Sequence, residues 1–305
     1  MVHLALVTGA SRGIGRAMAR RLASEGIAVA AVSRTLRPGD GALSGSLEET
    51  VELIRADGGT AGAFAVDLGD PDLDRVALIA RIEAEMGLTV DILVNNAAAA
   101  RQHGKGFEEA TRRIFTETVE TNIWNTWDLM KAVVPGMRRV GHGWIVNLSS
   151  RMASPRVGPP FAPHPLRGGV LYGATKAAID RLSTGAALEL HPDNIAVNTL
   201  APNRGVATEN ANNFVPGWPA EPEETMAEAN LLLCTGDPQV LTGRVAYSLP
   251  LIKEFNRPVR TLDGRELVTG WQPDEIDERS LLPEYLVYAE SPEFPRDLLA
   301  KTGQL

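Results

Sequence analysis

Short apolar runs alternate with longer amphipathic segments along this chain of 305 residues, and this alternation constrains the fold more than any other feature. The runs are rich in Val, Ile and Ala, have the length of strands, and occupy residues 4–7, 27–32, 61–66, 91–94, 144–148, 195–200 and 244–248. Strands that are apolar throughout and are separated by helices form parallel sheets covered on both faces. The sequence therefore predicts an α/β fold with a doubly wound parallel sheet of about seven strands.

The segments between the runs carry start and stop signals of helices. Residues 46–59, 70–87 and 222–236 begin at Ser, Asp or Pro, carry acidic residues early and end at glycine. Two stretches rich in proline and glycine, 34–46 and 154–169, are expected to be irregular. Ligands of such sheets bind beyond the carboxyl ends of the strands, so the functional residues are expected at that edge.

Composition and charge argue against several kinds of partner. The net charge of -8 and the pI near 5.3 disfavour nucleic acid and anionic membranes, which require concentrated basic surface. No run approaches the length of a membrane span, and the first residues read as a strand without a secretion signal. Cys234 is the single cysteine and cannot form an internal disulfide, so a buried thiol and a cytoplasmic location are expected.

The first apolar run leads into TGASRGIG, residues 8–15, and then into a helical pattern. Glycines in such a turn allow the backbone to approach a pyrophosphate, which the N-terminus of the following helix attracts. A simple turn is the alternative. The residues predicted to bind a dinucleotide here are Gly9, Ser11, Arg12, Gly13, Ile14 and Gly15.

Ser33 and Arg34 follow the second run, where a protein that prefers NAD usually has an acidic residue for the ribose hydroxyls. Arg34, together with Arg12, could bind a 2′-phosphate, which favours NADP(H) over NAD(H). The alternative is that both arginines are solvated surface residues. After the third run, Asp67 and Leu68 are predicted to contact and cover the adenine, with a helix-starting Asp as the other interpretation.

Further motifs follow in a fixed order: NNAA (95–98), Asn122, NLSS (147–150) and YGATK (172–176). With the glycine turn, this set resembles the short-chain dehydrogenase/reductase family over residues 1–249. The resemblance implies a Rossmann-fold, NADP-binding domain and an NAD(P)-dependent oxidoreductase that acts on CH–OH groups. It also implies that Ser150 orients the substrate carbonyl, that Tyr172 is the acid/base, that Lys176 binds the nicotinamide ribose, and that Asn122 holds a water of a proton relay.

The spacing of Tyr172 and Lys176 has a physical reason. Helical residues four apart lie on one face, so the phenol and the ammonium can approach each other. A free phenol has a pKa of about 10, too high for a base at neutral pH. An ammonium about 4 Å away could supply about 4 kcal/mol at an effective dielectric of about 20, enough to lower that pKa by about three. Lys176 is therefore predicted to lower the pKa of Tyr172, and the small residues around the pair to let the helix lie close to the sheet.

The resemblance implies further cofactor contacts from Asn95, Ala97, Tyr172, Lys176, Pro202, Val206 and Thr208. Three departures stand out. Ser150 and Tyr172 are 22 residues apart (172 minus 150), more than is common in the family, and the extra residues of 154–169 are expected over the substrate pocket. Ala98 replaces a glycine. Asn203 replaces the glycine that usually follows the proline, where Asn tolerates the left-handed conformation.

Other polar and aromatic residues give weaker signals. The histidines at 3, 103, 142, 164 and 191 show no metal-ligand spacing, so no metal is predicted. Arg101, His103 and Lys105 could face substrate, with a polar loop as the alternative. Trp124 and Trp127 are expected in the core or at a subunit interface. Phe214 and Trp218, within 210–230, belong to the substrate lid by family position.

Residues 250–305 form a C-terminal extension beyond the domain of residues 1–249. An Asp-Gly pair between alternating segments predicts a β-hairpin there, and the extension is expected to pack on the domain or on a neighbouring subunit. Kinship implies a homodimer or homotetramer. The predicted function is hydride transfer between NADP(H) and a small-molecule ketone or secondary alcohol. The alternatives are an NAD-preferring dehydrogenase and a non-catalytic dinucleotide-binding sensor or scaffold.

Overall fold

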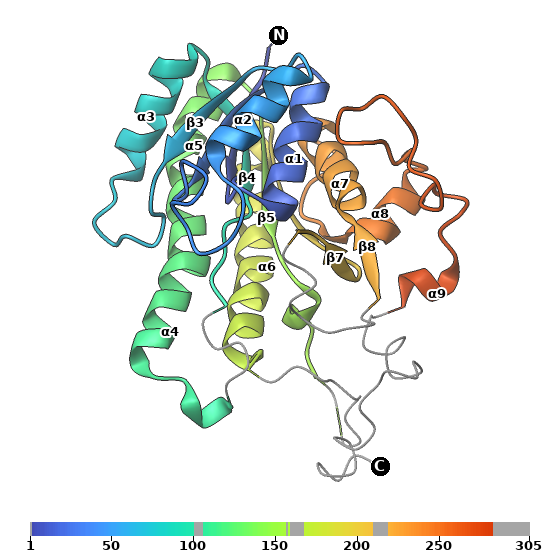
Figure 1. Ribbon diagram of the computed structural model, residues 1–305. Coiled ribbons are helices and arrows are strands. Elements are labelled where there is room, and N and C mark those ends of the chain that lie inside the picture. The colour runs from blue at the N-terminus through green and yellow to red at the C-terminus, as the bar shows by residue number, and fades with distance from the viewer. Residues whose placement is uncertain (1, 101–105, 157, 159–167, 210–218, 283–305) are drawn as a thin grey trace.

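A seven-stranded parallel sheet forms the centre of the molecule (Figure 1). The computed structural model describes residues 2–100, 106–156, 158, 168–209 and 219–282. The strands follow the order β3-β2-β1-β4-β5-β6-β9. Their bounds are β1 Leu4–Thr8, β2 Ala28–Ser33, β3 Ala61–Ala65, β4 Val90–Asn95, β5 Gly143–Leu148, β6 Ile195–Ala201 and β9 Val245–Tyr247.

The predicted fold is confirmed, because each of the seven apolar runs is a strand of this sheet and every neighbouring pair is parallel. The central strands are buried along their whole length, which explains why their sequences are apolar rather than alternating. A short parallel pair outside this sheet, β7 Gly205–Ala207 and β8 Ala220–Pro222, was not predicted.

Helices cover both faces of the sheet. On one face lie α1 Gly13–Ser24, α2 Leu47–Ala56, α7 Glu223–Thr235 and α8 Ser248–Glu254, with α1 and α7 side by side in Figure 1. On the other face lie α3 Arg75–Met86, α5 Asn125–Val140 and α6 Val170–Leu190. The remaining helical elements are η1 Phe107–Glu109, α4 Arg112–Val119, η2 Glu120–Trp124, η3 Arg151–Ala153, η4 His191–Asp193 and α9 Glu278–Leu281.

The sequence signals at the helix ends are confirmed where the structure shows them. The Ser46 side chain accepts a hydrogen bond from Glu49 N at 3.2 Å and caps α2. The Asp74 side chain caps α3 by accepting from Ala77 N at 2.9 Å, and Gly87 ends that helix with a φ of 69°.

The strand order reverses direction at β1 and β4, since β2 and β3 lie beyond β1 while β5, β6 and β9 lie beyond β4. The chain leaves the carboxyl ends of these two strands toward opposite faces, which opens a crevice at that edge of the sheet. The glycine turn follows β1, the Asn-Asn pair ends β4, and Ser150 follows β5. The fold therefore gathers the predicted functional motifs at one edge.

The C-terminal segment up to residue 282 packs against α1, α7 and α8. Val259 and Ile276 are buried in the core, and an antiparallel bridge between Arg260 and Leu267 spans the predicted Asp-Gly turn. The buried carboxylate of Glu228 on α7 accepts from Arg21 Nε at 2.6 Å and from Arg257 Nε at 2.9 Å.

Along the described residues, no helix is both long and apolar enough to cross a lipid bilayer.

Candidate active site

The glycine turn after β1 has positions at which the structure leaves no room for a side chain. Gly9 and Gly13 have positive φ values of 67° and 52°. A Cβ on Gly15 would lie 2.3 Å from Gly9 O, and one on Gly9 would lie 2.7 Å from Asn96 Nδ2. No side chain fits at positions 9 and 15, so the fold needs glycine there.

Thr8 and Asn96 fasten this turn to the end of β4. Thr8 Oγ1 donates to Val94 O and accepts from Asn96 N at 2.9 Å and Ala97 N at 3.0 Å, while Asn96 Nδ2 donates to Thr8 O at 2.9 Å. The sequence prediction named Asn95 instead. Asn95 Nδ2 points into the sheet and donates to Asn147 Oδ1 at 2.8 Å, so its side chain links β4 to β5.

An anion of the chain itself occupies the N-terminus of α1. Gly13 N donates to both carboxylate oxygens of Glu209, at 3.2 and 3.1 Å, and Arg16 forms an ion pair with Glu209 at 3.4 Å. Thr208 lies against the turn, 3.4 Å from where a Cβ on Gly13 would be. Free N–H groups and the helix dipole favour negative charge at this point. Its occupation by a carboxylate shows that the turn suits an anionic group.

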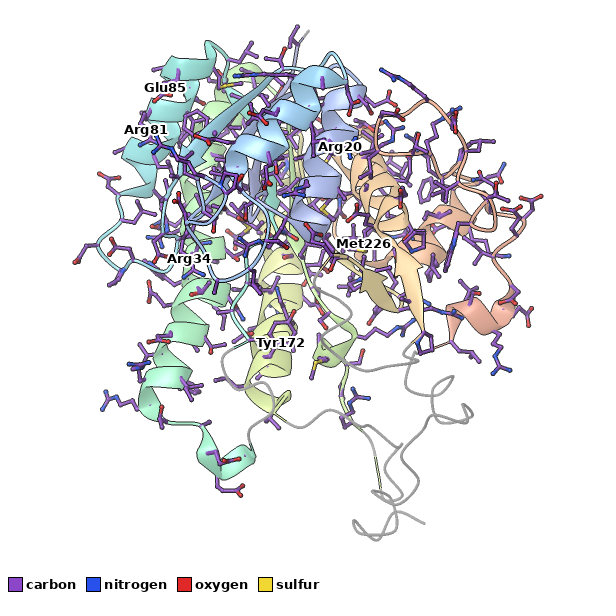
Figure 2. All side chains as sticks on the ribbon, in the orientation of Figure 1. Arg20, Arg34, Arg81, Glu85, Tyr172 and Met226 are labelled. Carbon is purple, nitrogen blue, oxygen red and sulfur yellow. The ribbon has the colours of Figure 1, made fainter. Side chains whose placement is uncertain are left out.

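Arg12 and Arg34 lie near each other beside the same turn, but they differ in their contacts. Arg12 Nη2 donates to Thr35 Oγ1 at 3.1 Å and to Gly45 O at 2.9 Å, which ties the turn to the irregular loop after β2. Burial, with help from the positive charges of Arg16 and Arg34, lowers the pKa of Arg12. Arg34 directly follows β2 and is exposed (labelled at the left in Figure 2).

Other predicted cofactor contacts have different positions. Ser33 Oγ accepts from Thr35 N at 3.2 Å. Asp67 is exposed and accepts from Gly69 N at 3.0 Å, whereas Leu68 is buried in the core beneath β3 and so does not present an open apolar surface. Val206 lies in β7 opposite Glu221 of β8.

The predicted catalytic residues Ser150, Tyr172 and Lys176 come together at the carboxyl end of β5. The Ser150 hydroxyl hydrogen-bonds the Tyr172 hydroxyl. Lys176 Nζ donates to Leu148 O at 2.6 Å and lies 5.6 Å from the centroid of the Tyr172 ring. Tyr172 projects from the first turns of α6 (Figure 2). The 22 residues between Ser150 and Tyr172 therefore do not separate the two side chains.

Small residues let α6 approach the exit of β5. A Cβ on Gly173 would lie 2.5 Å from Met152 O, and one on Gly169 would lie 1.8 Å from Met152 Cε. A larger residue at 173 would push the helix, with Tyr172 and Lys176, away from Ser150. The glycine next to Tyr172 is thus a requirement of the site.

The expected effect of Lys176 on Tyr172 is wrong in this structure. Burial raises the pKa of Tyr172 to about 12, against a smaller lowering by the hydrogen bond from Ser150. Burial lowers the pKa of Lys176 to about 8, against the opposing charge of Asp180. Desolvation has the larger effect because Lys176 is buried and Tyr172 is half-buried, and because the Lys176 amine donates to the Leu148 carbonyl.

Asn122 lies in a single π-helical turn, η2, between α4 and α5. Its side chain is fully buried; Oδ1 accepts from Ala99 N at 2.7 Å, and Nδ2 donates to Ala99 O at 2.9 Å and Thr175 Oγ1 at 3.0 Å. The amide joins the segment after β4 to α6, one residue before Lys176. Because these bonds occupy the Asn122 amide, the water of the expected proton relay would have to be held by another atom.

Asn203 stands in place of the usual glycine for a different reason from the one expected. The non-glycine residues with positive φ in the described parts of the chain are Asn194 and Asn256, so Asn203 is not left-handed. Its side chain is used instead: Oδ1 and the backbone O accept from Arg151, and Nδ2 donates to Ser280 O at 2.7 Å. The substitution of Gly by Asn ties the loop after β6 to the residue after Ser150 and to the C-terminal segment.

Several predicted contacts fall outside the described residues: Arg101, His103 and Lys105, the lid residues Phe214 and Trp218, and most of the loop 154–169. Trp124 and Trp127 are 44% and 40% exposed, which excludes a core role for both. Sequence reasoning missed Asn96, Thr175, Arg151 and Glu209. Asn96 and Thr175 had a local signal, because they stand in the quoted motifs NNAA and YGATK.

Comparison with known proteins agrees with this arrangement. The family model described as short chain dehydrogenase matches residues 3–217. The chain is 35% identical over 203 residues to the 3-oxoacyl-[acyl-carrier-protein] reductase FabG of Staphylococcus aureus. The aligned region covers 66% of this chain and 74% of that protein. It is 32% identical over 245 residues to Dehydrogenase/reductase SDR family member 4 of Homo sapiens, covering 80% of each.

Several solved structures of similar fold hold NADP. A 3-oxoacyl (acyl-carrier-protein) reductase from Agrobacterium tumefaciens C58 with NADP bound has a TM-score of 0.66 and 30% identity, covering 80% of this chain and 92% of that chain. A metagenomic short-chain oxidoreductase in complex with NADP has a TM-score of 0.64 and 28% identity, covering 80% and 96%.

The fold, the bare glycine turn and these likenesses define an NAD(P)-dependent oxidoreductase that acts on CH–OH or ketone groups. The chain belongs to the short-chain dehydrogenase/reductase family.

Replacing Asn203 by glycine should destabilise the protein by about 1–3 kcal/mol, because the buried Asn203 side chain loses its contacts with Arg151 and Ser280 and leaves polar groups unpaired. Urea unfolding measures the change. Asn256→Gly is the matched control; Asn256 has a φ of 46°, so glycine should be tolerated there. An Asn203→Gly protein as stable as the wild type would show that the side-chain network contributes nothing.

Proposed function

We propose that this enzyme reduces a ketone to a secondary alcohol with NADPH and catalyses the reverse reaction with NADP⁺. The proposal is supported above all by one observation, the convergence of Ser150, Tyr172 and Lys176 at the same edge of the sheet as a glycine turn in which Gly9 and Gly15 leave no room for a Cβ. A carbonyl oxygen needs a proton donor while its carbon receives a hydride, and these residues supply the donor side.

The residues present fit a dinucleotide. The backbone of Gly13 and the start of α1 would hold the pyrophosphate, at the point where Glu209 now lies. Glu209 and a phosphate cannot share that N–H group, so cofactor binding requires the segment of Thr208 and Glu209 to move. Lys176 would bind the nicotinamide ribose, as the family resemblance implies. When bound, the cofactor supplies the hydride.

Tyr172 would act as the proton donor to the carbonyl oxygen, with the Ser150 hydroxyl bonded to the same oxygen. A phenol whose pKa is raised to about 12 is fully protonated at neutral pH, so it is ready to donate. The Lys176 amine, with a pKa lowered to about 8, is mainly in its charged form at pH 7, because the charged form of an amine prevails below its pKa. The pair is therefore set for reduction, and alcohol oxidation would need the phenol pKa to fall.

The preference for NADP(H) rests on the two arginines near the end of β2. Arg34 is exposed and carries a guanidinium that can bond a 2′-phosphate in two places. No acidic residue stands at 33 or 34 to accept the ribose hydroxyls that NAD(H) would present. NAD(H) remains the alternative cofactor.

Removal of the Arg34 side chain should weaken NADPH binding about threefold to tenfold, and leave NADH binding unchanged, because only NADPH has the 2′-phosphate. Fluorescence titration of both nucleotides against Arg34→Ala measures this. Arg37→Ala is the control: its side chain lies in the loop after β2, is 71% exposed, and pairs with Glu48 of α2. Equal losses for NADPH and NADH, or tighter NADH binding by the wild type, would contradict the assignment.

Substitution of Tyr172 by phenylalanine should reduce kcat at least about 100-fold, because the proton donor is lost. NADPH affinity should change less than about twofold, since the phenol oxygen is not needed to hold the nucleotide. Tyr247→Phe is the control, because Tyr247 stacks with Arg151 at 4.3 Å and stands outside the proposed proton path.

Steady-state kinetics with a panel of ketones, monitored through the consumption of NADPH, gives kcat, and fluorescence titration gives the affinity for NADPH. β-Ketoacyl thioesters should be included because two similar proteins are named as 3-oxoacyl reductases. A wild type that binds NADPH but turns over no member of the panel would favour the sensor or scaffold alternative. Unchanged kcat in Tyr172→Phe would remove Tyr172 from the mechanism.

We also propose a homodimer or homotetramer. Phe115, Trp124 and Trp127 are exposed along the α4–η2–α5 helix, at 55%, 44% and 40%, and exposed large apolar side chains in one region favour association. We also propose a cytoplasmic location, because Cys234 is free and buried and disulfides are typical of oxidising compartments.

A further inference from the structure

The amino edge of the sheet, opposite to the proposed active site, carries a second cluster of polar side chains. His3 stands directly before β1, Asp91 is the second residue of β4, and His142 stands directly before β5. β1, β4 and β5 are adjacent in the sheet and parallel, so these residues meet although they are far apart in the sequence. Local spacing could not reveal this cluster, and the sequence predicted no metal.

Both histidines bind one oxygen of the same carboxylate. His3 Nδ1 lies 2.5 Å and His142 Nε2 lies 3.2 Å from Asp91 Oδ2, and the three atoms are all within 4.8 Å of one another. The other oxygen, Oδ1, accepts from Leu4 N at 2.9 Å. That bond holds the carboxylate in place and leaves Oδ2 directed at the two imidazole nitrogens.

An irregularity of the sheet gives Asp91 this orientation. Leu4 pairs with Val90 and Ala5 pairs with Ile92, so the register shifts at Asp91 and leaves it without a partner on β1. Such a bulge re-aims the side chain of the extra residue. The Asp91 side chain is 8% exposed, His142 16% and His3 30%, so the cluster is mostly buried but open on the side of His3.

Trp144 fixes both imidazole rings. Its ring centroid lies 5.4 Å from that of His3 and 5.3 Å from that of His142. The indole is itself anchored, because Trp144 Nε1 donates to Gly236 O at 2.7 Å. Rings that are held by packing lose little freedom when they bind a ligand, which favours a site formed in advance.

We propose that His3 Nδ1, His142 Nε2 and Asp91 Oδ2 bind one Zn²⁺ ion, with water completing the coordination. Two imidazole nitrogens and one carboxylate oxygen suit zinc, whereas Mg²⁺ and Ca²⁺ prefer oxygen ligands throughout. The ion would bind each imidazole in its neutral form, through the nitrogen that now faces the carboxylate, with the ring proton on the other nitrogen.

This zinc site would be structural. β5 runs from His142 at one end to Ser150 beyond the other, a separation of roughly 25 Å for extended chain. An ion at that distance cannot touch the reacting carbonyl. It would instead join the first residues of β1, β4 and β5, and so stabilise the folded protein in proportion to its occupancy.

Isothermal titration of tag-free, chelator-treated full chain with ZnCl₂ tests the proposal. We expect one equivalent bound with a Kd of about 10 μM or tighter, and a loss of affinity of about tenfold or more in His142→Gln and in His3→Gln. The melting temperature of the wild type should rise with zinc, whereas MgCl₂ should show no saturable binding to the wild type.

His191→Gln is the matched control, since His191 bonds Gln239 O and stands away from the cluster. It should bind zinc like the wild type. Cys234 does not compete, because it is 1% exposed. If His142→Gln fails to fold, His3→Gln, at the open side of the cluster, decides the question. Absence of saturable zinc binding in the wild type, or binding by His3→Gln as tight as the wild type, would overturn the proposal.

Discussion

The burial of the Lys176 amine beside Tyr172 is the interaction on which the site depends. An ammonium removed from water is costly, and burial here lowers its pKa to about 8. The cost is offset by a short hydrogen bond to Leu148 O at 2.6 Å, the last residue of β5. That bond exists only because α6 lies tightly on the exit of β5, which Gly173 permits. The parallel sheet then delivers the glycine turn to the same edge, so the amine, the phenol and the anion site are held by one packing arrangement.

Much of this arrangement could be predicted from the sequence because it depends on local patterns. Apolar runs of strand length predict the strands, and apolar strands that alternate with helices are typical of a parallel sheet covered on both faces. The glycine turn was predicted from its position between a strand and a helix, and the structure leaves no room for a Cβ on Gly15. Ser150, Tyr172 and Lys176 were predicted from the resemblance of their motifs to the short-chain dehydrogenase/reductase family. They meet in the structure because a strand end and the first turns of a helix lie at one edge, whatever the length of the loop that joins them.

The remainder depends on contacts between distant residues. Asn203 bonds Arg151 and Ser280, which are 52 and 77 residues away, so a rule about turns misread its purpose. Glu209 reaches Gly13 across 196 residues. The pKa of Tyr172 was misjudged for a related reason: charges can be read from spacing, but burial is a property of the packed protein, and here burial has the larger effect.

The most direct measurement is an NMR titration of the lysine side chains in isotopically labelled protein. The account predicts one amine that titrates near pH 8 and is missing from Lys176→Met, because burial favours the neutral form and the charge is lost as pH rises through that value. Tyr172, with a pKa near 12, should stay protonated over the same range. If every lysine titrated above about pH 10, the ordinary value for a solvated amine, the buried ammonium at the centre of this account would be contradicted.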